Sequence, residues 1–277
     1  MIYTLENNIA KLAVDTKNCE IHSFKRKDKD IEYMWNGDPK FWKGRNPTLF
    51  PHVSSPSDKI LNFKGKDYKV NNHGFCRNSE FEFVEQTQGK LVFRLKDNEE
   101  TYSQYPYHFE LIVTYTLKDN IVSIDYDITN NDGGNMYFGF GQHPAFNCPL
   151  TSDKKFNDYY IEFDVEGDVE NNRLDLSYEL FDKYPTYIVN NVKSRKFTLS
   201  DSVNSVIIRT DDKYNIFAVW TPNAPFVCLE PWVNTLNTAD TKVFEDIKDN
   251  ICLKDRDTYH IGYSIEIVWA FHFKNKN

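Results

Sequence analysis

The sequence lacks the cysteine patterns that mark metal and disulfide sites. Its five cysteines are odd in number and widely spaced, and no CxxC pair occurs. They are Cys19, Cys76, Cys148, Cys228 and Cys252. Their spacing argues against a zinc ribbon or a redox dithiol. We expect reduced and mostly buried thiols, as is usual inside cells.

Long basic runs and long apolar runs are also missing. Against 33 Lys and Arg stand 41 Asp and Glu, for a formal net charge of −8. A partner rich in phosphates needs clustered cations, so this balance argues against nucleic acid and anionic membranes. No segment approaches the roughly 20 apolar residues of a membrane span, and the first residues do not resemble a signal peptide. We therefore expect a soluble, cytoplasmic protein. The sequence contains no argument for an oligomeric state.

Helical periodicity and common catalytic motifs are scarce. No apolar stripe lasts longer than about two helical turns, and only residues 38–42 and 174–181 could form short ones. GxGxxG, Walker, HExxH and GxSxG motifs are all absent, which argues against the enzyme classes built on them. Cys76 near His73 is the one candidate for a nucleophile with a histidine, and no local motif supports it.

Aromatic residues and alternating patterns are abundant. The chain holds 21 Phe and 17 Tyr, residue types that favour strands. Residues 109–117 and 121–128 alternate between apolar and polar around a turn at Lys118–Asp119–Asn120, which predicts a hairpin. The alternation recurs at 81–95 with a turn at Gly89, at 203–220 with a turn near Asp211–Asp212, and at 259–273; residues 10–14 and 19–26 predict another pair.

These short strands and turns predict an all-β fold. Strands without intervening helices are typical of a sandwich rather than of βαβ units. No linker, repeat or low-complexity segment interrupts the chain. We predict one large antiparallel β-sandwich domain over residues 1–277.

Four segments break the alternation and concentrate polar chemistry: 41–53, 71–77, 141–147 and 226–232. In a sandwich, such segments lie at strand ends or on the concave face of a sheet. Glu230 follows the apolar run 226–229 and precedes Pro231, which we expect to end that strand. A carboxylate there is costly to desolvate unless it has partners or a task. A structural and a functional role are about equally supported by this position.

Two of the seven histidines have unusual surroundings. A lone histidine is more often structural than catalytic, and His73 lies in a natural turn, residues 71–74. His143 is harder to explain structurally. Gly139 and Gly141 allow close backbone approach before it, and Pro144 restrains the chain after it.

Several short motifs, taken in order, resemble the aldose 1-epimerase (galactose mutarotase-like) family, and most closely its LacX-like bacterial subgroup. They span roughly residues 20–270. The matching stretches are EYMW (32–35), DPKFW (38–42), PTLFP (47–51), HGFCR (73–77) with EF (80–81), ET (100–101) with YPY (105–107), GQHPAF (141–146) and LEPW (229–232). Any one of these is weak evidence, but the ordered set is specific.

The resemblance implies a sandwich that binds a sugar in an open cleft on one sheet and interconverts the α and β anomers of an aldose. No metal or organic cofactor is implied. Glu230 matches the general base of the family and His143 its general acid, which a nearby carboxylate would keep protonated. His73 matches the histidine that contacts the sugar near its ring oxygen.

Other contacts with the sugar are implied less directly. Arg77 is a charge partner or a sugar contact, and Trp232 and Phe75 could stack on the apolar face of the sugar. The family often has a Gly-Arg pair after its Phe-Pro segment, but residues 50–56 contain no arginine. Arg45 or Arg77 could substitute for it. Asp182 is the nearest candidate for a carboxylate that holds sugar hydroxyls.

Three alternatives stay open. A carbohydrate-binding protein of the same fold without catalysis would keep the cleft. A metalloenzyme could use His73, His143 and Glu230 as ligands. An epimerase of a phosphorylated sugar would need a cationic clamp, which Lys43, Arg45 and Arg77 could supply.

Overall fold

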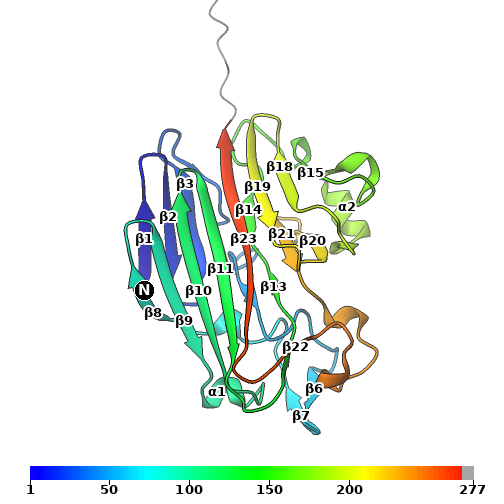
Figure 1. Cartoon of the computed structure of the whole chain (residues 1–277). Coiled ribbons are helices and arrows are strands. Elements are labelled where there is room, and N and C mark those ends of the chain that lie inside the picture. Colours follow the sequence, from blue (N-terminus) through cyan, green and yellow to red (C-terminus); the bar gives the residue numbers. More distant parts are fainter. Residues whose placement is uncertain (270–277) are drawn as a thin grey trace, which may run out of the picture.

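The computed structural model describes residues 1–269 of the chain, and antiparallel strands are the main regular structure in this range (Figure 1). The largest sheet has nine strands. In spatial order they are β16 (Arg173–Asp175), β15 (Tyr160–Phe163), β18 (Lys196–Ser200), β19 (Asn204–Thr210), β23 (Thr258–Trp269), β11 (Ile121–Asn130), β10 (Phe109–Lys118), β9 (Lys90–Lys96) and β8 (Glu82–Gln86).

A second sheet of six strands carries the candidate site described below. Its order is β17 (Tyr187–Asn190), β20 (Ile216–Trp220), β21 (Phe226–Trp232), β13 (Gly141–Gln142) and β5 (Thr48–Leu49), with β14 (Ala145–Asn147) also paired to β21. A third sheet contains β1 (Ile2–Glu6), β2 (Ala10–Asp15), β3 (Glu20–Arg26) and β4 (Ile31–Glu32). The two remaining pairs are β6 (Ile60–Phe63) with β7 (Lys66–Lys69), and β12 (Met136–Phe138) with β22 (Ile251–Leu253).

Helices are few and short in residues 1–269. They are α1 (Glu99–Tyr102), α2 (Tyr178–Lys183) and the 3₁₀ turns Cys76–Asn78, Phe156–Asp158, Glu170–Asn172, Leu236–Thr238 and Phe244–Asp246. The turn expected at 174–181 is present as α2, whereas residues 38–42 form hydrogen-bonded turns without a helix. None of the helices described has the length and apolar composition that crossing a bilayer requires.

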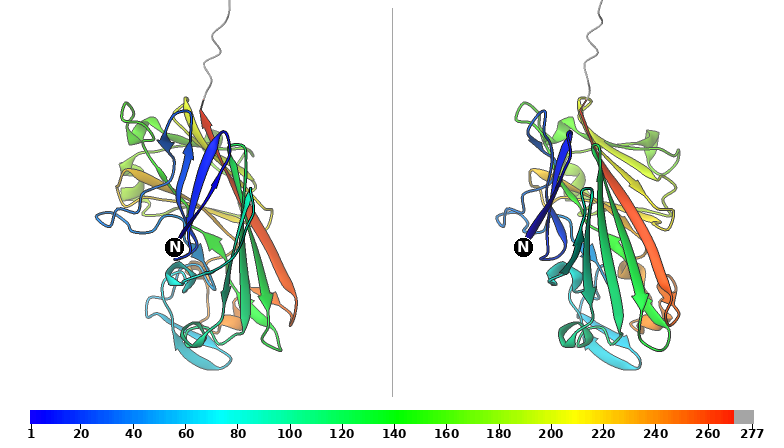
Figure 2. Two further views of the ribbon diagram at one scale, coloured as in Figure 1. Left: turned by 90° about the vertical axis from the view of Figure 1, so that its left-hand side faces the viewer. Right: turned by 60° about the vertical axis from the view of Figure 1, so that its left-hand side comes forward.

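The core lies between the nine-stranded sheet and the layer that faces it. Figure 2 shows the four-stranded sheet (blue) in front of the long strands β10, β11 and β23. The Tyr115 hydroxyl on β10 donates to the carbonyl of Cys19 across the two layers, at 2.6 Å. Further along, Phe197 of β18 stacks on Phe217 of β20, with ring centroids 3.6 Å apart. Alternate residues of β10 and β11 are buried, as their sequence pattern predicts.

The predicted all-β antiparallel fold is confirmed, and so are the hairpins at 109–128 and 81–95 and the pair of strands in residues 10–26. The strand expected at 259–273 is present to Trp269, and residues 270–273 lie outside the described range. The predicted hairpin at 203–220 is wrong. β19 pairs with β18 and β23, whereas β20 pairs with β17 and β21 in the other sheet. The turn near Asp211 therefore carries the chain from one sheet to the other. The prediction failed because alternation indicates that a strand has a buried face but does not identify its partner strand.

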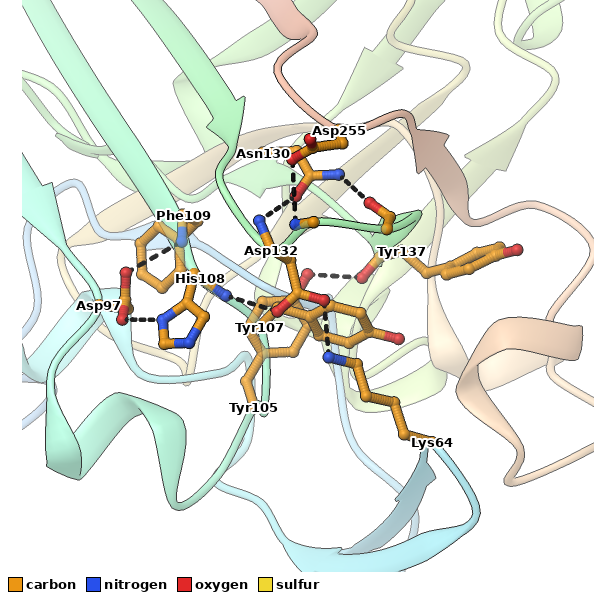
Figure 3. Close-up of polar contacts among 12 residues, drawn as sticks. Lys64, Asp97, Tyr105, Tyr107, His108, Phe109, Asn130, Asp132, Tyr137 and Asp255 are labelled. Atoms are coloured by element: carbon orange, nitrogen blue, oxygen red, sulfur yellow. Dashed lines mark hydrogen bonds and ion pairs between the residues drawn. The ribbon is translucent and has the colours of Figure 1, made fainter.

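A polar network anchors the β6–β7 hairpin, which follows directly after one wall of the candidate site. In Figure 3, Lys64 at the hairpin turn reaches Asp132, and its Nζ lies 2.7 Å from a carboxylate oxygen. The same ammonium lies 4.2 Å from the ring centroid of Tyr107. The backbone amide of Lys64 donates to Glu245 at 2.9 Å. These contacts tie the hairpin to the ends of β10 and β11.

Candidate active site

The outer face of the second sheet forms a cleft of about 540 Å³. On β21 the residues alternate between two environments: Val227 and Leu229 belong to the main core, whereas Glu230 and Trp232 line the cleft. The lining residues are Trp42, Ser54, Ser55, Pro56, Ser57, Lys59, Asn72, His73, Arg77, His143, Thr186, Trp220, Glu230, Trp232 and Asn237. All four segments singled out in the sequence contribute to this wall.

Glu230 lies within β21 rather than at its end, so the expectation that Pro231 ends the strand is wrong. The amides of Leu229 and Val233 donate to Pro144 and Phe140 on the neighbouring segment. Because amide direction alternates along a strand, the nitrogen of Pro231 faces the gap between β13 and β14. No hydrogen-bond donor is needed there, and the strand tolerates the proline.

His143 occupies that gap and is held between aromatic rings. Trp42 stacks on its imidazole with ring centroids 4.8 Å apart, and Trp220 packs edge-on at 5.5 Å. The close approach expected at Gly141 is present, because a Cβ there would lie 2.7 Å from Cδ1 of Trp232. The imidazole is 7% exposed, so one restrained edge faces the cleft.

His143 and Glu230 form a buried pair. Nε2 of His143 lies 3.3 Å from Oε2 of Glu230, which is 1% exposed. The contact is close, but it does not have the alignment of a hydrogen bond. Oε2 of Glu230 has no hydrogen-bond partner among the described residues, and neither does Nδ1, the other ring nitrogen of His143. Buried polar atoms are usually satisfied, so two unpartnered atoms in one buried pair are unusual and mark it as a candidate for function.

Burial favours the uncharged form of both groups. It raises the pKa of Glu230 well above its ordinary value, and the nearby indole N–H of Trp232 and the charge of Arg77 only partly oppose this shift. Burial also lowers the pKa of His143, and the neighbouring His73 and Arg77 lower it further. Burial therefore reverses the expectation that Glu230 keeps the imidazole of His143 protonated.

His73 is fixed by reciprocal hydrogen bonds with Ser54. The amide of Ser54 donates to Nδ1 of His73 at 3.0 Å, and the amide of His73 donates to the Ser54 carbonyl at 3.1 Å. Since Nδ1 is an acceptor, neutral His73 carries its proton on Nε2. Burial, with help from Arg77 and His52, lowers the pKa of His73 to about 3. His73 is therefore a neutral hydrogen-bond donor, 5.9 Å from His143 between ring centroids.

Arg77 is the cation beside the pair. It follows His73 on the 3₁₀ turn Cys76–Asn78 and lines the cleft half-buried. Its guanidinium makes no ion pair and no hydrogen bond with another residue in the range 1–269. Burial lowers the pKa of Arg77, although Glu20 and Glu230 oppose this shift. An incompletely solvated cation without a partner is suited to an anionic or hydroxyl-rich ligand.

Three residues expected to contact the sugar lie elsewhere. Phe75 is 4% exposed in the main core, where its ring stacks on Phe109 at 5.8 Å, so it offers no face to a ligand. Asp182 is an exposed residue of α2 that accepts from Asn223 at 3.1 Å. Arg45 donates from Nη1 to the carbonyl of His22 at 3.0 Å and lines a neighbouring cleft. The sequence-predicted residues that do converge are His73, Arg77, His143, Glu230 and Trp232.

Sequence reasoning missed much of the polar wall. Ser55, Ser57, Lys59 and Asn237 line the cleft from loops that carry no recognisable pattern. Trp42 lies in the segment 41–53, which breaks the strand alternation, and its position next to Phe41 was the available signal. Trp220 ends the regular strand β20, and no feature of the sequence marked it as a site residue.

The cleft also contains a possible ligand set for a metal. His143, Cys228 and Glu230 are buried, and one ligand atom of each lies within 4.8 Å of the others. This set differs from the trio of His73, His143 and Glu230 considered from the sequence. Burial raises the pKa of the Cys228 thiol, which disfavours the thiolate that a metal requires. We propose no metal site here.

Comparisons with known proteins show which family the chain resembles. The family model described as aldose 1-epimerase matches residues 1–255. Protein LacX of Lactococcus lactis subsp. lactis, in its chromosomal and plasmid forms, is 31% identical and covers 97% of this chain and 100% of its own.

Two solved structures are similar over nearly their whole length. A galactose mutarotase related enzyme from Lactobacillus acidophilus has a TM-score of 0.89 at 30% identity and covers 98% of this chain and 99% of its own. A galactose mutarotase-like protein from Lactobacillus casei has a TM-score of 0.87 at 27% identity and covers 97% and 100%. With the family model matched over residues 1–255, the chain belongs to the aldose 1-epimerase family.

Proposed function

We propose that this protein is an aldose 1-epimerase that interconverts the α and β anomers of an aldohexose without a cofactor. The observation that carries the proposal is the buried pair of His143 and Glu230, 3.3 Å apart, with unpartnered atoms in a polar cleft. Titratable groups with strongly shifted pKa values in a cleft are typical of acid–base catalysis. The mutarotase-related names of the similar structures support the same reaction.

The reaction needs one proton donor and one proton acceptor. In ring opening the C1–O5 bond breaks, its electron pair goes to O5, and O5 takes a proton from the acid. The O1–H proton passes to the base as the C1=O bond forms. Rotation about C1–C2 exposes the other face of the aldehyde, and O5 attacks C1 while the two proton transfers reverse. Atoms and charge balance with no external reactant.

Glu230 and His143 together supply both roles. The pair needs a single shared proton, because one member must donate while the other accepts. In one form of the pair the proton is on His143, and Glu230 is then the base, as the family resemblance implies. The other form, with the proton on Glu230, is favoured by burial and makes His143 the base. In either form reclosure reverses the roles, because the former acid has lost a proton and the former base has gained one.

The remaining walls are suited to hold a sugar. Nε2–H of His73 and the guanidinium of Arg77 are donors for hydroxyl or ring oxygens. Trp42 and Trp220, which are partly exposed, offer apolar surface for the C–H face of the ring. These contacts would position the hemiacetal at the pair, which is the main requirement for catalysis by proximity.

Mutarotation of freshly dissolved α-D-glucose and α-D-galactose tests the proposal, followed by polarimetry or by proton NMR of the anomeric signals. Wild-type protein should accelerate equilibration of at least one sugar above the buffer rate. Glu230→Gln keeps the shape of the side chain but cannot exchange the proton, so kcat/KM should fall by about 10²–10⁴-fold. Glu162→Gln, at an exposed position on β15, is the matched control and should keep full activity.

Two outcomes would contradict the proposal. If wild-type protein accelerates neither sugar, a simple aldohexose mutarotase is wrong, and NMR titration of the same sugars then distinguishes a binding protein from one with another substrate. If Glu230→Gln is as active as Glu162→Gln, the acid–base pair has been assigned to the wrong residues.

A further inference from the structure

A second cleft of about 480 Å³ adjoins the candidate active site. Its lining residues are Asp15, Lys17, Asn18, Glu20, His22, Lys43, Gly44, Arg45, Arg77 and Asn78. Arg77 lines both clefts. The segment 42–45 separates them, with Trp42 on the active-site side and Lys43, Gly44 and Arg45 on the other. A group bound in the second cleft would therefore lie beside the sugar site.

The second cleft gathers positive charge in an acidic protein. The chain carries a formal charge of −8, yet Lys17, Lys43, Arg45 and Arg77 converge here. None of these four cations is within 4 Å of a carboxylate oxygen in residues 1–269. Four cations that share a concave surface without ion-pair partners repel one another, and an anion between them would relieve that repulsion.

The two acidic residues of the cleft do not cancel this charge. Asp15 already has partners, because the N-terminal ammonium lies 2.8 Å from its carboxylate and Nε2 of His22 lies at 3.4 Å. Glu20 is 3% exposed on β3 and makes no ion pair with a described residue. Burial raises the pKa of Glu20 to about 7, so it is partly uncharged near neutrality. The net charge that faces a ligand in this cleft is positive.

The donors that line the second cleft are of the types that bind phosphate. One side of the Arg45 guanidinium is fixed by its bond to the His22 carbonyl, which holds the group in place. The Arg77 guanidinium is free of protein partners and can bind two oxygens at once. Lys17 and Lys43 are exposed, so their ammonium groups can adjust around a bound anion. Two guanidinium groups and two ammonium groups outweigh the two negative charges of a phosphate dianion and offer several donors to its oxygens.

We propose that the second cleft binds a phosphate group through Lys17, Lys43, Arg45 and Arg77. The phosphate could be the ester group of a phosphorylated aldose whose ring occupies the active-site cleft, an assignment that rests on the proposed epimerase function. Free inorganic phosphate has the same chemistry and is the other source.

Calorimetric titration of the full chain with inorganic phosphate and with glucose 6-phosphate and galactose 6-phosphate tests the site without relying on activity. Wild-type protein should bind at least one of these probes at millimolar concentrations, more weakly at high salt. The double variant Lys17→Ala/Lys43→Ala changes only exposed side chains and should lose affinity by about tenfold or more. Lys40→Ala, an exposed lysine of the same loop outside the cleft, is the matched control and should bind as wild type does.

Kinetics then separate the two sources. If the phosphate is part of the substrate, wild-type kcat/KM should be higher for a hexose 6-phosphate than for the free hexose. The double variant should then lower that ratio by about tenfold, while Lys40→Ala keeps it. If the protein binds phosphate but shows no higher kcat/KM for the hexose 6-phosphate, the site is supported and its ligand is free inorganic phosphate. The proposal is overturned if wild-type protein binds none of the three probes, or if the double variant binds them as tightly as Lys40→Ala does. Absence of mutarotation would refute the epimerase function and leave the binding result intact.

Discussion

Glu230 lies in the middle of a strand in which all seven residues are buried. An ionised carboxylate in such a place loses its hydration, and the nearest cations do not restore it. Arg77 attracts the carboxylate, but burial is the larger effect and keeps its pKa high. The residue proposed for catalysis therefore costs the fold stability, as is common where side chains are selected for chemistry.

This cost predicts a stability change that depends on pH. Unfolded, Glu230 ionises near its ordinary pKa of 4.5, whereas the folded protein holds the proton to higher pH. Between those two pKa values the folded state binds more protons, so the free energy of unfolding falls as pH rises, by at most about 1.4 kcal/mol per pH unit. Glu230→Gln removes this effect, so the variant should be stabilised relative to wild type, and by more at pH 8 than at pH 5.

Urea unfolding of both proteins across that pH range measures the difference. Glu162→Gln, exposed on β15, should show a difference from wild type that does not change with pH. A flat difference for Glu230→Gln would mean that the carboxyl ionises as easily in the folded protein as in the unfolded chain.

At the scale of the element, the turn at 71–74 decides where His73 points. Gly74 adopts φ +72°, and a Cβ on it would lie 2.1 Å from the carbonyl oxygen of Phe50. The next residue donates its amide to that same carbonyl at 3.1 Å. Only glycine allows this approach, and the approach places His73 opposite Ser54.

Gly74→Ala should therefore disturb both the fold and sugar binding. The variant combines an unfavourable φ with a backbone clash, so we expect a loss of more than about 1 kcal/mol in the free energy of unfolding and a raised KM. Gly65→Ala is the matched control. Gly65 has φ +76° in the β6–β7 turn, but a Cβ there meets no atom within 4 Å. If the two variants lose the same stability, the conformation of the turn matters and the contact with Phe50 does not.

At the scale of the molecule, the two large sheets depend on each other through the core. One continuous apolar cluster includes residues from Leu5 to Ile267 and contains both rings of the Phe197–Phe217 stack. The candidate site lies on the outer face of the second sheet, so the position of β21 depends on how that sheet packs against the nine-stranded one.

We expect Phe217→Ala to lower the free energy of unfolding by about 3–5 kcal/mol, because it removes a fully buried ring between the sheets. Unfolding in urea, followed by fluorescence and by loss of activity, should show one transition with a shared midpoint. Phe83→Ala, at a partly buried position on the edge strand β8, should cost less. Two separate transitions in wild-type protein would show that the chain folds as two units and not as the single domain predicted.

The alternation of apolar and polar residues was sufficient to locate most strands and the all-β class, because one buried face is a local property of a strand. The ordered motifs were sufficient for the family and for part of the cleft wall, including Glu230, His143 and His73. In each of these cases the information lies within a few neighbouring residues, where sequence reasoning has access to it.

Other features depend on residues far apart in the chain, and only the tertiary structure decided them. Alternation did not reveal that β19 and β20 belong to different sheets, because the same pattern suits any partner strand. The motif around His73 did not reveal that Phe75 faces the core. The charge states of Glu230 and His143, and the meeting of Lys17 with Arg77 in one cleft, follow from burial and from distant neighbours. Burial and long-range proximity are properties of the packed molecule, so no short stretch of sequence specifies them.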